Sequence, residues 1–201
     1  MGQFTLLRVV GRLVKATPDE SFGHELLFGE IPFEIVCILV VVAVAEIFHQ
    51  FGRRIADVQR EYPWIVWEEN GKILGYAYAH KFAVRISYRP SAELSVYLSP
   101  DARGKGIGRK LYEALFALLQ LQNVKSVYGI VTTPNPRSEA MHLTLGFSRV
   151  STLHNVGYKQ GWRDVSWYCK QIGEYREPLD PFLPIGSIDS AQLRAILNRF
   201  S

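Results

Sequence analysis

The sequence predicts an α/β fold of the mixed α+β kind, with strands and helices in one domain. Segments with apolar residues at every second position alternate along the chain with segments of helical period. An Asn70-Gly71 pair between two strand patterns predicts a hairpin turn. A further strand pattern, Glu93 to Ser99, leads directly into a glycine-rich turn and a helical pattern. With 201 residues, 48% hydrophobic and 21% charged, the chain is long enough to bury the core of one domain.

The first part of the chain begins with a strand pattern and a helix start. Leu6 to Lys15 has the apolar content of a strand. Thr17 followed by Pro18 predicts a helix N-cap and first turn, because proline fits the first helical position.

Residues 35–45 contain no charged or strongly polar side chain and are rich in valine, which fits a buried helix or a buried strand. The run is too short to span a membrane, since spanning needs about 20 apolar residues. Residues 46–60 predict a helix that ends before Tyr62-Pro63, because the residue before a proline avoids the α conformation.

The middle of the chain carries the clearest periodicity. Leu111, Leu115, Leu118 and Leu119 lie at helical spacing and predict the buried face of one helix. The expected strands cover residues 64–68, 73–82, 93–99, 125–132, 147–154 and 163–170, and the expected helices cover residues 106–121 and 137–145.

After residue 172 the composition changes. Residues 177–184 are rich in proline, and Ser187 to Phe200 has apolar residues at helical spacing. Residues 173–201 therefore predict an extended segment and an amphipathic helix that dock on the domain or on a dimer partner.

Charge and cysteine content exclude several classes of protein. The net charge of +4 comes without a long basic run, which argues against nucleic-acid binding. Cys37 and Cys169 lie far apart in apolar segments without metal-ligand spacing, so we expect buried thiols. No signal-peptide pattern opens the sequence, and a cytoplasmic location is expected.

The turn at residues 103–108, Arg-Gly-Lys-Gly-Ile-Gly, has the composition of a pyrophosphate site. Glycines let successive backbone N–H groups approach phosphate oxygens at the positive end of a following helix. Arg109 stands where a dinucleotide fingerprint needs glycine or alanine, and no Gly-Lys-Ser/Thr of a P-loop is present.

This turn and its flanks resemble the acyl-CoA site of the GNAT superfamily of N-acetyltransferases, in particular the phosphinothricin acetyltransferase branch. The resemblance covers about half of the chain and rests on three segments in the expected order: Ser95 to Tyr112, Pro134 to Phe147 and Asn155 to Tyr168. It implies a GNAT fold, with a twisted, mostly antiparallel central sheet that splays at the acyl-CoA site and is flanked by helices. The GNAT domain would cover residues 1–172, of which residues 1–60 fit the family poorly.

The resemblance implies transfer of acetyl from acetyl-CoA to a small amine by direct attack, without a metal. A protonated amine cannot attack a thioester, so a base is required, and Glu93 matches the family's general base. His142 matches a histidine of the family's active site and is a candidate to protonate the leaving thiolate, with Tyr112 and Tyr168 as weaker alternatives. The implied acetyl-CoA contacts are Ser95, Val96, Tyr97, Arg103, Gly104, Lys105, Gly106, Ile107, Gly108, Asn135 and Ser138.

The acceptor is less well defined by the sequence. Arg85, Tyr88 and Arg89 precede Glu93 and could bind the anionic groups of a phosphinothricin-like or methionine sulfoximine-like amino acid, or could be solvated loop residues. Pro90-Ser91 and the valine-rich run depart from the family pattern. Another amine acceptor, or a CoA-binding sensor without turnover, therefore stays open. Family members commonly form dimers, so a homodimer is expected.

Overall fold

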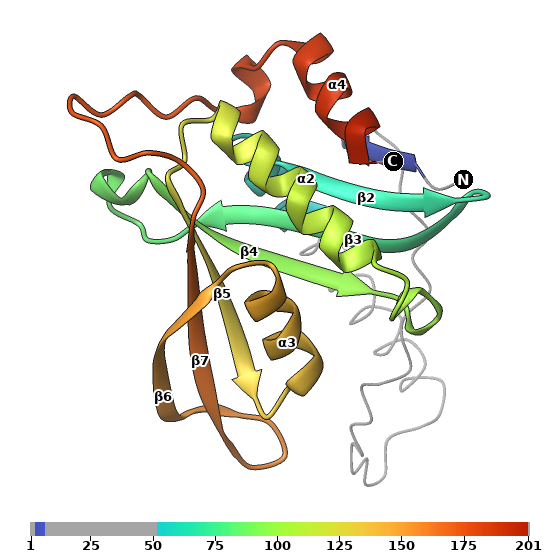
Figure 1. Ribbon diagram of the computed structural model, residues 1–201, viewed down its shortest axis with the longest axis vertical. Helices are drawn as coiled ribbons and strands as arrows, with labels where there is room; N and C mark the ends of the chain where they lie inside the picture. The colour runs from blue at the N-terminus through green and yellow to red at the C-terminus, as the bar shows by residue number, and fades with distance from the viewer. Residues whose placement is uncertain (1–2, 7–51, 201) are drawn as a thin grey trace, which may run out of the picture. The chain divides into compact units, whose positions relative to one another are not determined.

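The computed structural model describes residues 3–6 and 52–200 (Figure 1). The chain divides into two compact units, residues 8–57 and the remainder. Of the smaller unit only residues 52–57 are described, and residues 52–59 are helical. Several sequence predictions lie outside the described residues: most of the strand at Leu6–Lys15, the Thr17-Pro18 helix start, the apolar run 35–45 with Cys37, and the first part of the helix at 46–60.

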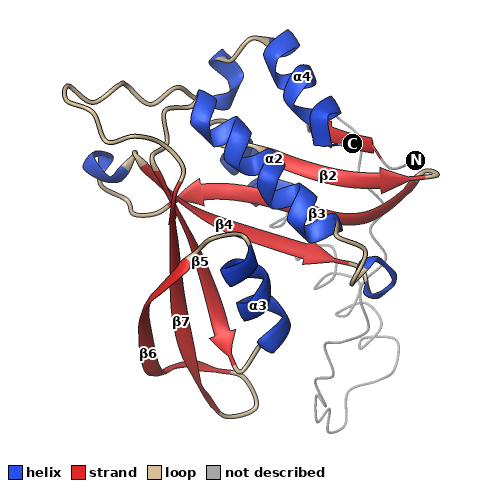
Figure 2. Cartoon of the chain, in the orientation of Figure 1, coloured by secondary structure: helices blue, strands red, loops and turns tan. Residues whose placement is uncertain are grey.

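A seven-stranded sheet forms the centre of the larger unit (Figure 2). The strands lie in the order β1-β2-β3-β4-β5-β7-β6, and every neighbouring pair is antiparallel except β4 and β5. The mixed, mostly antiparallel sheet predicted from the sequence is thus confirmed. The strands are β1 (Gln3–Leu6), β2 (Trp64–Glu69), β3 (Lys72–Lys81), β4 (Ser91–Leu98), β5 (Ser126–Thr133), β6 (Ser148–Tyr158) and β7 (Trp162–Gln171).

The described helices of this unit are α2 (Ile107–Leu121), α3 (Pro136–Thr144) and α4 (Ser190–Phe200). The first two follow the sequence prediction to within one residue. The prediction that the last helix begins at Ser187 is wrong, because residues 185–187 form a separate 3₁₀ turn. The Asp189 carboxylate then accepts the amides of Ala191 and Gln192 and sets the start of α4.

The predicted β2–β3 hairpin is confirmed. Asn70 and Gly71 have φ values of 51° and 76°, as a type I′ turn requires at its two central positions. β1 covers Gln3–Leu6 and pairs with β2 in the register Leu6 to Ile65, so Leu6 is the one residue of the predicted Leu6–Lys15 strand that is described.

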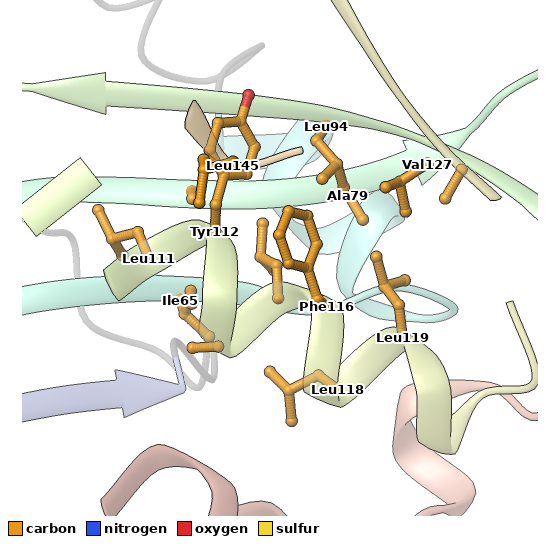
Figure 3. Packing of buried hydrophobic residues seen from close by; sticks show 14 of the residues in the cluster. Ile65, Ala79, Leu94, Leu111, Tyr112, Phe116, Leu118, Leu119, Val127 and Leu145 are labelled. Carbon is orange, nitrogen blue, oxygen red and sulfur yellow. The ribbon is translucent and has the colours of Figure 1, made fainter. Parts of the chain in front are cut away.

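The main core lies between α2 and one face of β2, β3 and β4 (Figure 3). Leu111, Leu115, Leu118 and Leu119 are fully buried, which confirms the predicted apolar face of this helix. In Figure 3, α2 directs Leu111 and Phe116 toward the sheet residues Ile65, Ala79 and Leu94. The opposite face of the same strands is therefore left to other groups.

β4 and β5 separate along their length. They pair only from Ser91–Ser126 to Leu94–Gly129, although both strands continue for four more residues. Figure 1 shows the two strands starting together and running apart. The splayed sheet expected from the resemblance is therefore present.

The C-terminal residues pack on the larger unit. Leu193 and Leu197 of α4 and Ile185 before it belong to the main core, and α4 lies beside α2 (Figure 1). The extended segment is hydrogen-bonded as well, with Leu183 exchanging backbone and side-chain bonds with Gln122 at the end of α2.

Candidate active site

Glu93 lies on the sheet face opposite α2. Its neighbours Ala92 and Leu94 are buried in the core on the other face, because side chains alternate along a strand. Glu93 faces His80 of β3, its partner in the antiparallel register. The Glu93 carboxylate and the His80 ring lie 3.4 Å apart (Oε1 to Nε2), and their side chains are 21% and 28% exposed.

Aromatic side chains surround this pair on the same face. On one side, the Tyr78 ring lies 5.9 Å from His80 and stacks on Trp64 with a centroid distance of 4.1 Å. On the other side, Phe82 stacks on Tyr128, the residue in register with Glu93 on β5, at 4.2 Å. Sequence reasoning missed these rings, although aromatic residues at positions 76, 78 and 80 of a strand pattern indicate a shared face.

The splay leaves backbone amides of β4 without a strand partner on one side. The Ser99 amide donates to the Leu74 carbonyl, which fixes the alternation of the β3–β4 ladder. The amides of Ser95 and Tyr97 accordingly face β3, whereas those of Val96 and Leu98 face the gap between β4 and β5. Of the three β4 residues that sequence reasoning selected, Val96 is the one with its N–H group in the gap.

The glycine-rich turn precedes α2 as predicted. Gly104 and Gly106 have φ values of 76° and 77°, a region that favours glycine, and the space at both Cα atoms is open. Gly106 is the N-cap of α2 and provides no side-chain cap, and the first turn contains no acidic residue. The N-terminal amides of a 15-residue helix therefore point at an exposed turn that carries Arg103 and Lys105.

The remaining residues of the turn divide between packing and surface roles. Ile107 and Gly108 are buried at the start of α2, and Ile107 belongs to the core. The Arg109 guanidinium is held by Glu113 one helical turn away, at 2.8 Å. This arrangement fits a pyrophosphate held by backbone N–H groups, with Arg103 and Lys105 supplying positive charge.

Asn135 and Ser138 form the start of α3. The Asn135 side-chain oxygen accepts the Ser138 amide at 3.2 Å, and the Asn135 amide donates to the Glu139 carboxylate at 2.9 Å. This pair of bonds resembles a capping box, with the returning carboxylate at the fourth helical position in place of the third, and it satisfies two helix-end donors. Within the described part of the chain, the Asn135 side-chain nitrogen has no partner, so the cap is compatible with a contact to a ligand.

His142 is buried and its tautomer is defined by its partners. The ring Nδ1 donates to the Ser138 carbonyl at 2.7 Å, because a carbonyl can only accept. Nε2 then accepts from the Tyr112 hydroxyl at 3.3 Å. Burial lowers the pKa of His142, and burial together with the nearby charge of Glu93 raises the pKa of Tyr112. Both groups are therefore neutral near pH 7, and their bond links α3 to α2.

The three residues predicted to bind the acceptor lie in different surroundings. The Arg89 guanidinium contacts the Glu61 carboxylate at 2.7 Å and lies 5.1 Å from the centre of the Phe182 ring. All three residues line a hollow of about 80 Å³ together with Phe82, and Arg85 and Tyr88 are the more exposed. Arg89 thus also packs against the C-terminal segment, whereas Arg85 and Tyr88 only border the hollow.

A larger hollow of about 520 Å³ lies away from Glu93, against β6, β7 and the start of α3. Its lining mixes charges of both signs, including Arg149, Arg163 and Asp164. Glu93, His80 and His142 are not among the lining residues. We place the candidate site at Glu93 because that region combines a carboxylate, the splay and the glycine-rich turn.

The described ranges hold neither a metal cluster nor a membrane-spanning helix. Residues 3–6 and 52–200 contain no group of three His, Cys, Asp or Glu side chains placed to hold a metal ion. In the same part of the chain, no helix has the length and apolarity needed to cross a bilayer. Cys169 forms no disulfide and is half-buried, so the expectation of a buried thiol there is wrong. Its strand β7 lies between β5 and the edge strand β6.

This combination of a splayed sheet, a glycine-rich turn at a helix start and a carboxylate beside the splay defines a class of CoA-dependent acyltransferase folds. Residues 40–147 match the model of the acetyltransferase (GNAT) family. The chain belongs to this family.

Similarity to individual proteins extends further along the chain. It is 35% identical over 132 residues to a phosphinothricin N-acetyltransferase of Streptomyces viridochromogenes, covering 65% of this chain and 72% of the relative. It is 41% identical over 103 residues to an N-acetyltransferase of Streptomyces griseus, covering 51% of this chain and only 53% of the relative, about half its length.

A solved structure gives the same result for the fold. The phosphinothricin acetyltransferase from Sinorhizobium meliloti, crystallised in complex with acetyl-CoA, superimposes with a TM-score of 0.63 at 31% identity. The superposition covers 69% of this chain and 79% of that one. The GNAT fold predicted from the sequence is thereby confirmed.

Proposed function

We propose that this protein transfers the acetyl group of acetyl-CoA to the amino group of a small amino-acid-like compound of the phosphinothricin or methionine sulfoximine type. The single observation that carries the proposal is the position of Glu93 on β4, beside the point where β4 and β5 separate. A proton acceptor there lies next to the gap into which free backbone amides point. The relatives of known activity act on the same class of compound or are N-acetyltransferases.

The residues of this chain fit acetyl-CoA as a co-substrate. The Gly104 and Gly106 turn, the uncapped start of α2 and the charges of Arg103 and Lys105 would hold the pyrophosphate. Ser95, Val96 and Tyr97 would line the acyl arm, and Asn135 and Ser138 would contact it near the start of α3. When bound, acetyl-CoA supplies the activated thioester carbonyl that an amine can attack.

The chemistry of the site then follows from groups on three elements. Glu93 takes a proton from the substrate ammonium, because only the neutral amine is a nucleophile. The amides of Val96 and Leu98 stabilise negative charge that develops on an oxygen in the gap. As the carbon–sulfur bond breaks, the Tyr112 hydroxyl gives its proton to the leaving thiolate and regains one from the amine nitrogen, which loses its second proton as the amide forms. His142 Nε2, which accepts this hydroxyl in the resting protein, holds it in place.

Substrate selection is assigned to the face around Glu93. Arg85 is exposed and suited to a carboxylate or phosphinate, while the guanidinium of Arg89 is already held by Glu61. Tyr88 borders the same hollow and supplies a hydroxyl and an aromatic surface. We therefore assign the contacts with the acceptor to Arg85 and Tyr88. Arg89, held by Glu61, contributes indirectly by fixing the loop that carries them.

Two features of the wider protein belong to the same proposal. We infer a homodimer acting in the cytoplasm, in line with the sequence expectations. Exposed apolar residues on β6 and at the start of β7, among them Val150, Tyr158 and Trp162, are compatible with an interface.

The test is release of CoA thiol from acetyl-CoA with a panel of amines. The panel contains phosphinothricin, methionine sulfoximine, common amino acids, polyamines and a peptide with a free N-terminus. We expect turnover with the first two compounds. Turnover with the other amines alone would show that the protein is an acetyltransferase with a different acceptor. Binding of acetyl-CoA without turnover on any compound would favour a CoA-binding sensor instead.

A further inference from the structure

His80 is a titratable group that the proposed reaction does not yet use. It lies directly across from Glu93 on the neighbouring strand, with Nε2 3.4 Å from the Glu93 Oε1 atom. Its ring is only partly exposed and is flanked by the Tyr78 ring. A histidine at this distance from a catalytic carboxylate can exchange a proton with it.

The hydrogen bond of the other ring nitrogen, Nδ1, determines which nitrogen of the neutral His80 ring carries the hydrogen. Nδ1 lies 3.1 Å from the Lys81 carbonyl oxygen. Because a carbonyl oxygen only accepts, Nδ1 carries the hydrogen of this bond. The neutral ring therefore presents the lone pair of Nε2, not an N–H group, to the Glu93 carboxylate.

Without a proton between them, two hydrogen-bond acceptors, Nε2 of His80 and Oε1 of Glu93, lie opposite each other at 3.4 Å. Uptake of one proton replaces that unfavourable contact by a charge-assisted hydrogen bond between Nε2 and Oε1. The arrangement thus favours holding one proton in common, and the exposed edge of the imidazole gives that proton a route to solvent.

We propose that His80 is a positioning and proton-sharing residue for Glu93, so that the base is the Glu93–His80 pair and not the carboxylate alone. The ammonium N–H bond of the substrate breaks and its electron pair stays on nitrogen. The proton is held between Oε1 and Nε2 and then leaves through the imidazole to water, which balances the reaction. The catalytic consequence rests on the proposed function, whereas the sharing of a proton does not.

Other charged or titratable groups around the pair have partners or distinct positions. Lys81 directs its ammonium group to Glu61, at 2.8 Å, and away from this role. Tyr128 lies in register with Glu93 on β5, and Tyr112 senses the Glu93 charge from α2. Tyr78 contacts the imidazole through its ring. None of these supplies a second carboxylate or imidazole to His80.

The first experiment compares His80→Gln and His80→Ala with the wild type. The glutamine amide can still donate to Glu93 but cannot accept and release a proton. We expect kcat to fall about tenfold or more in both variants, with KM for acetyl-CoA unchanged. The acidic limb of the pH–rate profile should move by about one pH unit to lower pH, and added imidazole should partly restore turnover in His80→Ala.

A matched control is available at another histidine–carboxylate pair. His154 lies 2.8 Å from Asp164, and the His154 side chain is 73% exposed. His154→Gln should leave kcat and the pH profile as in the wild type. If the His80 variants keep the wild-type kcat and pH profile, His80 has no part in proton transfer and the proposal is wrong.

A second experiment needs no turnover and separates this inference from the proposed function. The ring nitrogens of His80 are observed by nitrogen-15 NMR at one pH in the wild type and in Glu93→Gln. If Nε2 and Oε1 share a proton, the Nε2 signal of the wild type is shifted from that of a free acceptor nitrogen and changes in Glu93→Gln. The same Nε2 signal in both proteins would overturn the inference even if the protein were an active acetyltransferase.

Discussion

At the residue scale, the buried histidine of the candidate site depends on a glycine opposite it. A Cβ atom placed on Gly129 of β5 would lie 2.2 Å from Nε2 of His142. That nitrogen accepts the Tyr112 hydroxyl, so any side chain at position 129 displaces the ring that makes this bond. Gly129 is therefore required by a close approach between a strand and a helix, and not by its own backbone conformation.

We expect Gly129→Ala to lower the free energy of unfolding by about 1–3 kcal/mol through overpacking. Gly157→Ala on β6 is the matched control, because its nearest neighbours lie at 3.8 Å, an ordinary contact distance. Urea unfolding of both variants measures the difference. Equal stability of the two variants would show that the His142 ring moves aside at no cost.

The ionisation of His142 gives a second residue-scale prediction. Burial lowers its pKa in the folded protein below the ordinary value of about 6.5. The unfolded chain then binds more protons than the folded one as the pH falls below that value, so stability is lost toward acid. In His142→Asn this contribution disappears.

The measurement is the free energy of unfolding of both proteins between pH 5 and pH 8. The difference between wild type and His142→Asn should be constant above about pH 7.5 and should shrink as the pH falls below about 6.5. Other titrating groups are common to both proteins and cancel. A difference that does not vary with pH would contradict a buried, neutral His142.

At the element scale, the start of α2 carries the predicted phosphate site. Gly106 and Gly71 have nearly the same φ, 77° and 76°, and open space at their Cα atoms. They differ in position, since Gly106 caps α2 whereas Gly71 lies in the β2–β3 turn, which meets the segment before the glycine-rich turn through the exposed Lys72–Asp101 ion pair at 3.3 Å. Alanine at either position costs about 1 kcal/mol of stability through its strained backbone.

Acetyl-CoA affinity separates these two glycines. We expect Gly106→Ala to weaken binding at least about tenfold, and Gly106→Asp to weaken it further by adding negative charge. Gly71→Ala should bind acetyl-CoA as the wild type does, although it loses similar stability. Calorimetric titration with acetyl-CoA measures the affinity of the three variants. If Gly106→Asp binds acetyl-CoA as tightly as the wild type does, the glycine-rich turn is not part of the acetyl-CoA site.

The elements themselves were largely predictable from the sequence, because their periodicity is strong and their ends carry Asn-Gly, Pro and Gly signals. The start of α4 was not, since Ser187 and Ser190 are equally plausible helix starts until the 3₁₀ turn is seen. Glu93 was found through family resemblance. Its partner His80 was missed because strand register, which brings residues 13 positions apart to one point, is not readable from local pattern.

At the scale of the whole molecule, Gln122 joins three segments of the larger unit. It lies just after α2, and its fully buried side-chain amide donates to the carbonyls of Glu61 and Leu183, at 2.6 and 2.8 Å. The Glu61 carboxylate in turn holds Lys81 and Arg89. The C-terminal segment is thus tied, through Gln122 and Glu61, to the end of β3 and to the loop that precedes β4.

Replacing Gln122 tests whether this connection stabilises the fold. Gln122→Ala removes the side-chain donor to the Leu183 carbonyl and one of the two donors to the Glu61 carbonyl, which keeps the Ile185 amide. With the loss of a fully buried side chain, we expect the free energy of unfolding to fall by about 2–3 kcal/mol. Gln120→Ala is the control on the same helix: its exposed side chain makes one bond, to the Ile172 carbonyl at 2.6 Å, and its loss should cost about 1 kcal/mol or less. Chemical denaturation measures both. If Gln122→Ala lowers the free energy of unfolding no more than Gln120→Ala does, the hydrogen bonds of Gln122 do not stabilise the fold. The C-terminal segment is then held by its apolar contacts alone.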